Sequence, residues 1–177
     1  MKKLILSLSL LIVSCLVAKY SVAQIQPVAK WIFHIGPSIS FGTKAIANND
    51  AGLGLLGGVE KNIYKNVSVG AETGFTYLIG DKTYTVPGKN KAYTIPLLAE
   101  MKAYFLSQFY ISPRAGVIYF IMNDQTNSHI SLAYGIAGGF NLPKKSNRIN
   151  ISAGYTSFRY DKLQRGYATL AAAIIIN

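Results

Sequence analysis

Apolar and polar residues alternate along most of the chain from residue 31 onward. Between residues 67 and 79 the odd-numbered positions are mostly apolar. The even-numbered positions up to 76 are small, polar or charged: Ser68, Gly70, Glu72, Gly74 and Thr76. A period of two residues is that of a β-strand, whose side chains point alternately to opposite faces. The pattern therefore predicts an all-β protein.

The same alternation predicts seven strands, and a more uniformly apolar eighth segment follows them. The predicted strands cover residues 31–42, 52–63, 67–80, 92–105, 109–122, 129–141, 148–159 and 167–176. The connections alternate between mostly longer ones (43–51, 81–91, 123–128 and 160–166) and tighter ones (64–66, 106–108 and 142–146). An even number of strands joined in this way indicates an eight-stranded antiparallel up-and-down barrel.

The pattern also predicts which face of each strand meets lipid. A bilayer accepts β-structure only where every backbone group is paired and no sheet edge is left open. We therefore expect a transmembrane barrel with bulky apolar side chains outside and small or charged ones in the lumen. The longer loops would lie outside the cell, and the tighter turns and both ends of the barrel would face the periplasm.

Residues 1–23 have the pattern of a removable signal peptide. Lys2 and Lys3 precede an apolar stretch, residues 4–18, which is shorter than the ~20 residues of a membrane-spanning helix. We expect cleavage after Ala23, which leaves one barrel domain over residues 24–177. An alternative is a lipobox at residues 12–15, in which Cys15 would be the lipidated first residue of a lipoprotein.

The composition and charge narrow the possible partners. The chain is 50% hydrophobic and 12% aromatic but only 14% charged, with a formal net charge of +11. No uninterrupted apolar run after the signal is long enough for a transmembrane helix. Nucleic acid is an improbable partner for an exported chain, so outer-membrane lipids with anionic headgroups are the expected counter-charge. Basic residues near the predicted loops are candidates for contact with lipopolysaccharide phosphates: Lys82, Lys89, Lys91, Lys162 and Arg165.

Aromatic residues on the predicted outer face fall at two heights once strand direction is assigned. The periplasmic group is Trp31, Phe105, Phe109 and Phe140, and the outer group is Phe41, Phe75, Tyr77, Tyr93, Tyr119 and Tyr155. Amphipathic rings form such girdles at the two interfaces of a bilayer. Tyrosines are also common in any β-sheet, which is the alternative explanation.

Charged residues on the inner face predict a polar network in the lumen. A turn centred on Ser107 places Glu100 opposite Arg114, and we expect these two side chains to form an ion pair. The expected network comprises Glu60, Glu72, Glu100, Lys102, Arg114 and His34. Because an eight-stranded barrel is just wide enough to be filled by its own side chains, a structural network is favoured over a gated polar path.

The sequence offers little that points to catalysis. Its two histidines, His34 and His129, lack a neighbouring pattern that specifies a Ser-His-acid triad. The glycine-rich stretch 52–58 is not followed by a helix that would support a phosphate site. No cluster has metal-ligand spacing. We therefore expect no enzyme activity, metal or cofactor; a lipid A-modifying hydrolase is the alternative to be tested.

A family resemblance rests on residues 93–105, whose sequence is YTIPLLAEMKAYF. This stretch resembles the I-P-L-L strand with a basic and aromatic end found in small outer-membrane β-barrel proteins of Bacteroidota, which are related in architecture to OmpA-like and OmpX-like barrels of the porin-like class. The resemblance implies the cell outer membrane, delivery by the barrel-assembly machinery and a monomer. We expect a structural or surface-interaction role. A lipid-modifying enzyme, a narrow solute channel and a lipocalin-like soluble ligand-binding barrel are the alternatives.

Overall fold

The computed structural model describes residues 31–42, 49–80, 91–105, 108–122, 128–142, 148–160 and 163–176. The predicted signal peptide, with Cys15 and the cleavage site, lies outside the described residues. Eight strands are formed: β1 (Trp31–Gly42), β2 (Asn49–Tyr64), β3 (Val67–Gly80), β4 (Lys91–Phe105), β5 (Phe109–Met122), β6 (Ser128–Leu142), β7 (Arg148–Tyr160) and β8 (Leu163–Ile176). Within the described ranges no helix is long and apolar enough to cross a membrane.

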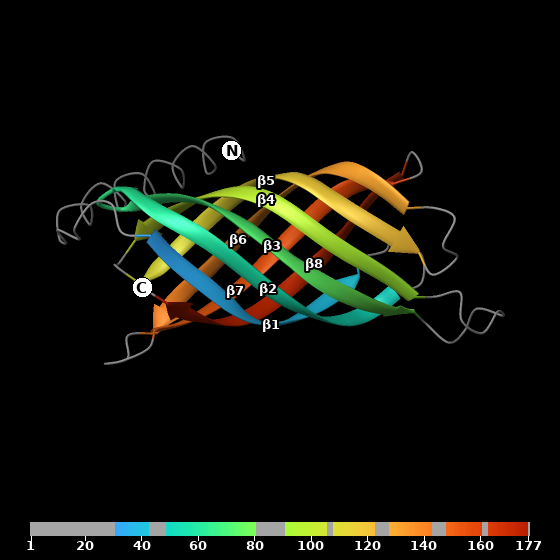
Figure 1. Ribbon diagram of the computed structural model, residues 1–177, viewed down its shortest axis with the longest axis horizontal. Coiled ribbons are helices and arrows are strands. Elements are labelled where there is room, and N and C mark those ends of the chain that lie inside the picture. The colour runs from blue at the N-terminus through green and yellow to red at the C-terminus, as the bar shows by residue number, and fades with distance from the viewer. Residues whose placement is uncertain are drawn as a thin grey trace, which may run out of the picture.

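The strands pair in chain order, and β8 pairs with β1, so the sheet closes into a barrel (Figure 1). Every neighbouring pair is antiparallel. The predicted eight-stranded antiparallel up-and-down barrel is therefore confirmed. Below, the terminal end is the end at which β1 begins and β8 ends, and the loop end is the opposite one.

The register determines how far the strands tilt. Following paired residues around the wall from Ile32 leads through Glu60, Gly70, Glu100, Arg114, Gly135, Thr156 and Tyr167 back to β1 at Gly42. The walk thus returns ten residues further along β1 than it began. This stagger accompanies the strong strand tilt visible in Figure 1. An eight-stranded barrel of this kind has an interior that side chains can fill.

The predicted strand boundaries hold for most of the chain and fail at the last hairpin. β8 was expected from residue 167, but it begins at Leu163, and the β7–β8 pairing continues to Tyr160 and Leu163. The expected long connection over 160–166 is therefore wrong. The adjacent polar residues Gln164 and Arg165 resemble a loop in the sequence. In the barrel, Gln164 donates a hydrogen bond to the Tyr134 hydroxyl at 3.1 Å, and Arg165 is buried.

Three prolines lie within strands, and each interrupts the pairing on one side only. The pairing skips Pro37 between β1 and β8, Pro96 between β3 and β4, and Pro113 between β4 and β5, whereas the opposite neighbour of each proline is paired normally. Proline has no N–H to donate to a sheet. The interruption at Pro113 falls beside Lys102, a residue of the barrel interior described next.

Candidate functional site

A charged cluster fills the terminal half of the barrel interior, and Lys102 lies at its centre. The Lys102 ammonium is 2.6 Å from Glu60 Oε2 and 3.2 Å from Glu100 Oε1. All three side chains are nearly inaccessible to solvent: Lys102 is 6%, Glu60 5% and Glu100 2% exposed. One cation therefore balances two enclosed carboxylates.

Neutral side chains complete the coordination of these carboxylates. Tyr104 donates to Glu60 Oε1 at 3.1 Å, and Ser68 donates to Glu60 Oε2 at 3.4 Å. Ser112 donates to Glu100 Oε2 at 3.2 Å. The contact between Glu100 Oε1 and Lys102 is a charge contact rather than a hydrogen bond, because that oxygen has no hydrogen-bond partner. Enclosed charges persist only where they are paired in this way.

The second part of the cluster joins Arg114 to Glu72. The predicted register is confirmed, because Glu100 pairs with Arg114 and Phe105 with Phe109 along β4 and β5. The expected ion pair between Glu100 and Arg114 is wrong: Arg114 bonds to Glu72 instead. Lys102 already contacts Glu100, and the longer arginine side chain reaches past β4 to β3.

Glycine makes room for this arginine. A Cβ atom at Gly154, on β7, would lie 2.1 Å from Arg114 Nη2. The guanidinium thus extends from β5 to a carboxylate on β3 while lying against the backbone of β7. His34 occupies the interior in a similar way, with its imidazole against Gly58, where a Cβ would be 2.5 Å from Cε1. The six predicted lumen residues therefore all lie on the inner face.

The loop half of the interior holds a buried apolar cluster besides polar side chains such as Thr94, Thr156 and Arg165, which corrects the expectation of small or charged side chains throughout the lumen. A single buried cluster, called here the apolar plug, consists of Leu78, Ala92, Leu98, Ile118, Phe120, Ala133, Phe158 and Tyr167. The rings of Phe120 and Phe158 are 5.5 Å apart, and those of Phe158 and Tyr167 are 6.4 Å apart. These residues come from six strands. A signal existed in the sequence, because segments such as 117–121 are apolar on both faces and not on alternate residues.

The outer wall is apolar on every strand, and its aromatic residues form two bands. The predicted aromatics all lie on this wall: six are exposed (Trp31, Phe41, Phe75, Phe105, Phe109 and Tyr155) and four half-buried (Tyr77, Tyr93, Tyr119 and Phe140). At the terminal end, Phe109 contacts both Phe105 and Phe140, with ring centroids 6.2 and 5.8 Å apart. At the loop end, Tyr93 contacts Phe75 and Tyr77. Phe33 and Tyr134 are exposed aromatics that were missed although they share the outward parity. Tyr64 was missed because it has the parity of the lumen residue Glu60, and the register shift between Asn62 and Tyr64 turns it outward.

The two aromatic bands are separated by about the thickness of a membrane's apolar layer. Trp31 and Phe41 lie ten residues apart on β1. At about 3.3 Å per residue and a tilt near 40°, they differ in height by roughly 25 Å. Transmembrane barrels carry an outward apolar band of about this height between aromatic girdles.

The two histidines and the basic residues named in the sequence analysis lie in different parts of the chain. His129 is exposed near the start of β6, and His34 is in the interior. Among the described residues there is no group of three His, Cys, Asp or Glu side chains placed to hold a metal. Arg165 was expected in an outer loop but is buried in β8, and Lys91 begins β4. Lys82, Lys89 and Lys162 lie outside the described residues.

Comparison with known proteins identifies the architecture. No protein-family model matches the chain, and no curated protein matches it. Solved structures do. Neisserial surface protein A matches with a TM-score of 0.60 at 12% identity, over 84% of this chain and 97% of that one. Ail, the attachment invasion locus protein of Yersinia pestis, matches with a TM-score of 0.60 at 17% identity, over 84% and 99%. The outer membrane protein OprG from Pseudomonas aeruginosa matches with a TM-score of 0.53 at 11% identity, over 84% and 93%. The chain therefore has the fold of eight-stranded outer-membrane barrels.

Proposed function

We propose that this protein is an integral, monomeric barrel of the bacterial outer membrane with a sealed interior and a structural or surface-interaction role. One observation carries the proposal: a wall that is apolar on all eight strands, bounded by two aromatic bands, surrounds an interior closed by its own side chains. The fold shared with Neisserial surface protein A, Ail and OprG supports the membrane location.

The outward side chains favour a bilayer over water as the surroundings. Large hydrophobic residues are exposed on all eight strands, and several are more than half exposed, such as Leu53 at 62% and Leu97 at 57%. Soluble monomers rarely expose one continuous apolar surface of this extent. A lipocalin-like soluble barrel requires the reverse arrangement, with polar residues on the outer wall.

The interior favours a closed barrel over a channel. The charged cluster occupies the terminal half, and the apolar plug occupies the loop half, where Phe120 and Phe158 are 1% and 0% exposed. An ion entering from the loop end would have to displace packed aromatic rings. We therefore propose that the wild-type barrel conducts no ions.

Conductance in planar bilayers tests this proposal. We expect no stable current steps from the purified, refolded chain, whereas a general porin inserted under the same conditions gives them. Stable steps of uniform size from the wild-type chain would overturn the sealed interior. Failure to insert into vesicles, measured by protease protection and heat-modifiable gel migration, would overturn the membrane location.

We propose that anionic lipid headgroups, including lipopolysaccharide phosphates, contact the rims of the barrel, where Arg148 and Arg159 are exposed. We also propose that the barrel-assembly machinery delivers the chain to the membrane. Ail has been solved in complex with the heparin analogue sucrose octasulfate, so a sulfated glycan is a rational further probe.

We also propose that the barrel has no lipid-modifying activity. Lipid A and phospholipid should therefore be recovered intact after incubation with the barrel in vesicles. Release of fatty acid that depends on His34 or His129 would contradict the proposal.

A further inference from the structure

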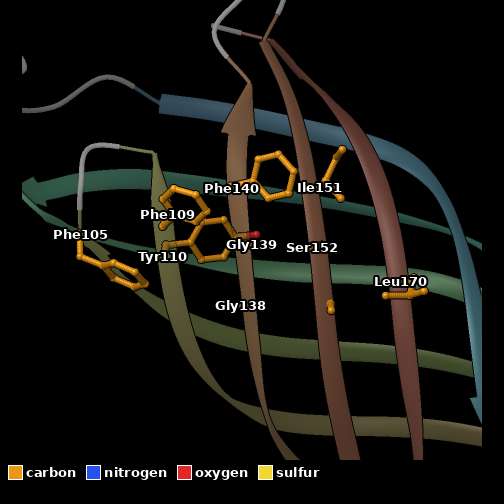
Figure 2. Close-up of a pocket in the computed structure, with 10 residues that line it drawn as sticks. Phe105, Phe109, Tyr110, Gly138, Gly139, Phe140, Ile151, Ser152 and Leu170 are labelled. Carbon is orange, nitrogen blue, oxygen red and sulfur yellow. The ribbon is translucent and has the colours of Figure 1, made fainter. Parts of the chain in front are cut away.

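A crevice opens on the outer wall across strands β4 to β8. It has a volume of about 380 Å³ and is lined by Phe105, Phe109, Tyr110, Gly138, Gly139, Phe140, Ile151, Ser152, Ala153 and Leu170. Figure 2 shows the aromatic rings gathered at one end of the crevice, with Ile151 and Leu170 on two neighbouring strands. The crevice therefore begins at the terminal-end aromatic band and extends from it along the apolar wall.

The hollow exists because two small residues lie side by side. Gly138 pairs with Ala153 across β6 and β7, and their outer neighbours in the same row are Ile111 and Leu170. Glycine in a strand weakens the strand and often marks close approach of another molecule. The missing side chain at Gly138 is thus the main cause of the depression.

Gly138 differs from the other outward-facing glycines of the described strands. At Gly166 an added Cβ would lie 2.3 Å from the Tyr155 hydroxyl, and at Gly57 it would meet the Ile35 side chain at 3.8 Å. At Gly138 the only atom nearby is the Tyr110 carbonyl oxygen, 3.5 Å away. Neighbouring side chains approach the first two glycines, but none approaches Gly138.

The floor of the crevice excludes a peptide strand as its occupant. Pairing is unbroken from Phe109–Phe140 along β5 and β6, and it is also unbroken between β6 and β7 and between β7 and β8 beneath the crevice. The backbone groups are therefore used within the barrel, and an added strand would find no partners. The exposed lining is almost entirely carbon, which suits hydrocarbon.

We propose that this crevice binds one acyl chain of a phospholipid from the leaflet at the terminal end of the barrel. A lipid whose headgroup lies level with Phe105, Phe109 and Phe140 has its acyl chain directly beside the opening. The volume is near the lower limit of small-molecule sites, which is about 300 Å³, so it suits a single chain better than a whole lipid. This inference rests on the proposed membrane location and adds a specific lipid site to it.

Native mass spectrometry of the refolded barrel tests the site. The protein is equilibrated in detergent with a low molar ratio of 1-palmitoyl-2-oleoyl-phosphatidylethanolamine, and the retained one-to-one complex is measured. Gly138→Leu fills the crevice. Gly57→Leu is the matched control, because Gly57 also faces outward at a similar depth but lies on β2, away from the crevice. Ala153→Leu fills the same crevice from β7 and serves if Gly138→Leu does not fold.

We expect the amount of retained one-to-one complex to fall about tenfold in Gly138→Leu and in Ala153→Leu. A loss of this size corresponds to two or more methylene groups of the acyl chain losing their contacts with the protein. The amount retained by Gly57→Leu should be unchanged. Equal retention in all folded variants would overturn the site. Barrel dimers that disappear in Gly138→Leu would also overturn it, because the occupant would then be a second copy of this chain. A chain that inserts into vesicles but retains no lipid refutes only the crevice, whereas a chain that fails to insert refutes the membrane location.

Discussion

Removing the Lys102 ammonium is the most informative perturbation of the interior. In Lys102→Met the side chain keeps a similar length, but Glu60 and Glu100 both lose the cation that contacts them at 2.6 and 3.2 Å. Removing one partner of a buried ion pair costs about 3–5 kcal/mol, because an uncompensated charge is left behind. That loss lowers the folding equilibrium constant by roughly two to four orders of magnitude. We expect Glu100 to be destabilised more than Glu60, because Glu100 Oε1, the oxygen that contacts Lys102, accepts no hydrogen bond that could replace this contact.

Urea unfolding in phospholipid vesicles measures this effect. The chain has one tryptophan, Trp31, which lies on the outer wall and reports release from the bilayer by its fluorescence. Lys65→Met, at an exposed turn residue, is the control and should leave the unfolding midpoint unchanged. The triple variant Glu60→Gln, Glu100→Gln and Lys102→Met should recover much of the lost stability, because it removes the uncompensated charges. Equal midpoints for Lys102→Met and Lys65→Met would refute the structural role of the cluster.

Three further variants test the remaining parts of the barrel by the same unfolding assay. Leu55→Arg, on the outer wall beside Pro37 and so between the levels of Trp31 and Phe41, should cost about 2–4 kcal/mol, whereas Tyr64→Arg at the rim should cost less than about 1 kcal/mol; similar losses would place Leu55 outside hydrocarbon. Phe158→Ala removes a fully buried ring of the apolar plug and should cost about 3–5 kcal/mol, and a negligible loss would contradict that packing. Gly154→Val should cost about 1–3 kcal/mol, because its Cβ would overlap the Arg114 guanidinium; a neutral effect would show that Arg114 lies elsewhere.

The fold and the register could be predicted from the sequence because two constraints agree on them. Alternation with period two places Val69 and Phe75 outside and Ser68 and Thr76 inside, and the short turn at 106–108 aligns Phe105 with Phe109. A shift by one residue would reverse every side chain along a strand. The outward positions of the aromatic residues followed from the same rule.

The pairing of charges and the apolar plug could not be predicted in this way. The register shows that Glu100 on β4 pairs with Arg114 on the neighbouring strand β5. It does not show that the Lys102 side chain contacts Glu100 while the Arg114 side chain bonds to Glu72. Long side chains in an enclosed lumen can contact partners two strands away, and which partner they contact depends on barrel curvature and on gaps such as the one at Gly154. Ile118 and Phe120 were not recognised as lumen residues, because a segment that is apolar on both faces shows no alternation.

The central claim is that the outer wall lies in hydrocarbon between two interfaces, and tryptophan depth measures this most directly. Brominated phospholipids quench a tryptophan most strongly when the bromine lies at its depth. Three single-tryptophan proteins are compared in vesicles: the wild type with Trp31, and the Trp31→Phe variants that carry Phe41→Trp or Leu55→Trp. We predict that Trp31 and Phe41→Trp are quenched best by bromines near the headgroups and Leu55→Trp by bromines deep in the acyl chains. Equal depths at the three positions, or quenching of Leu55→Trp by aqueous acrylamide alone, would contradict the account.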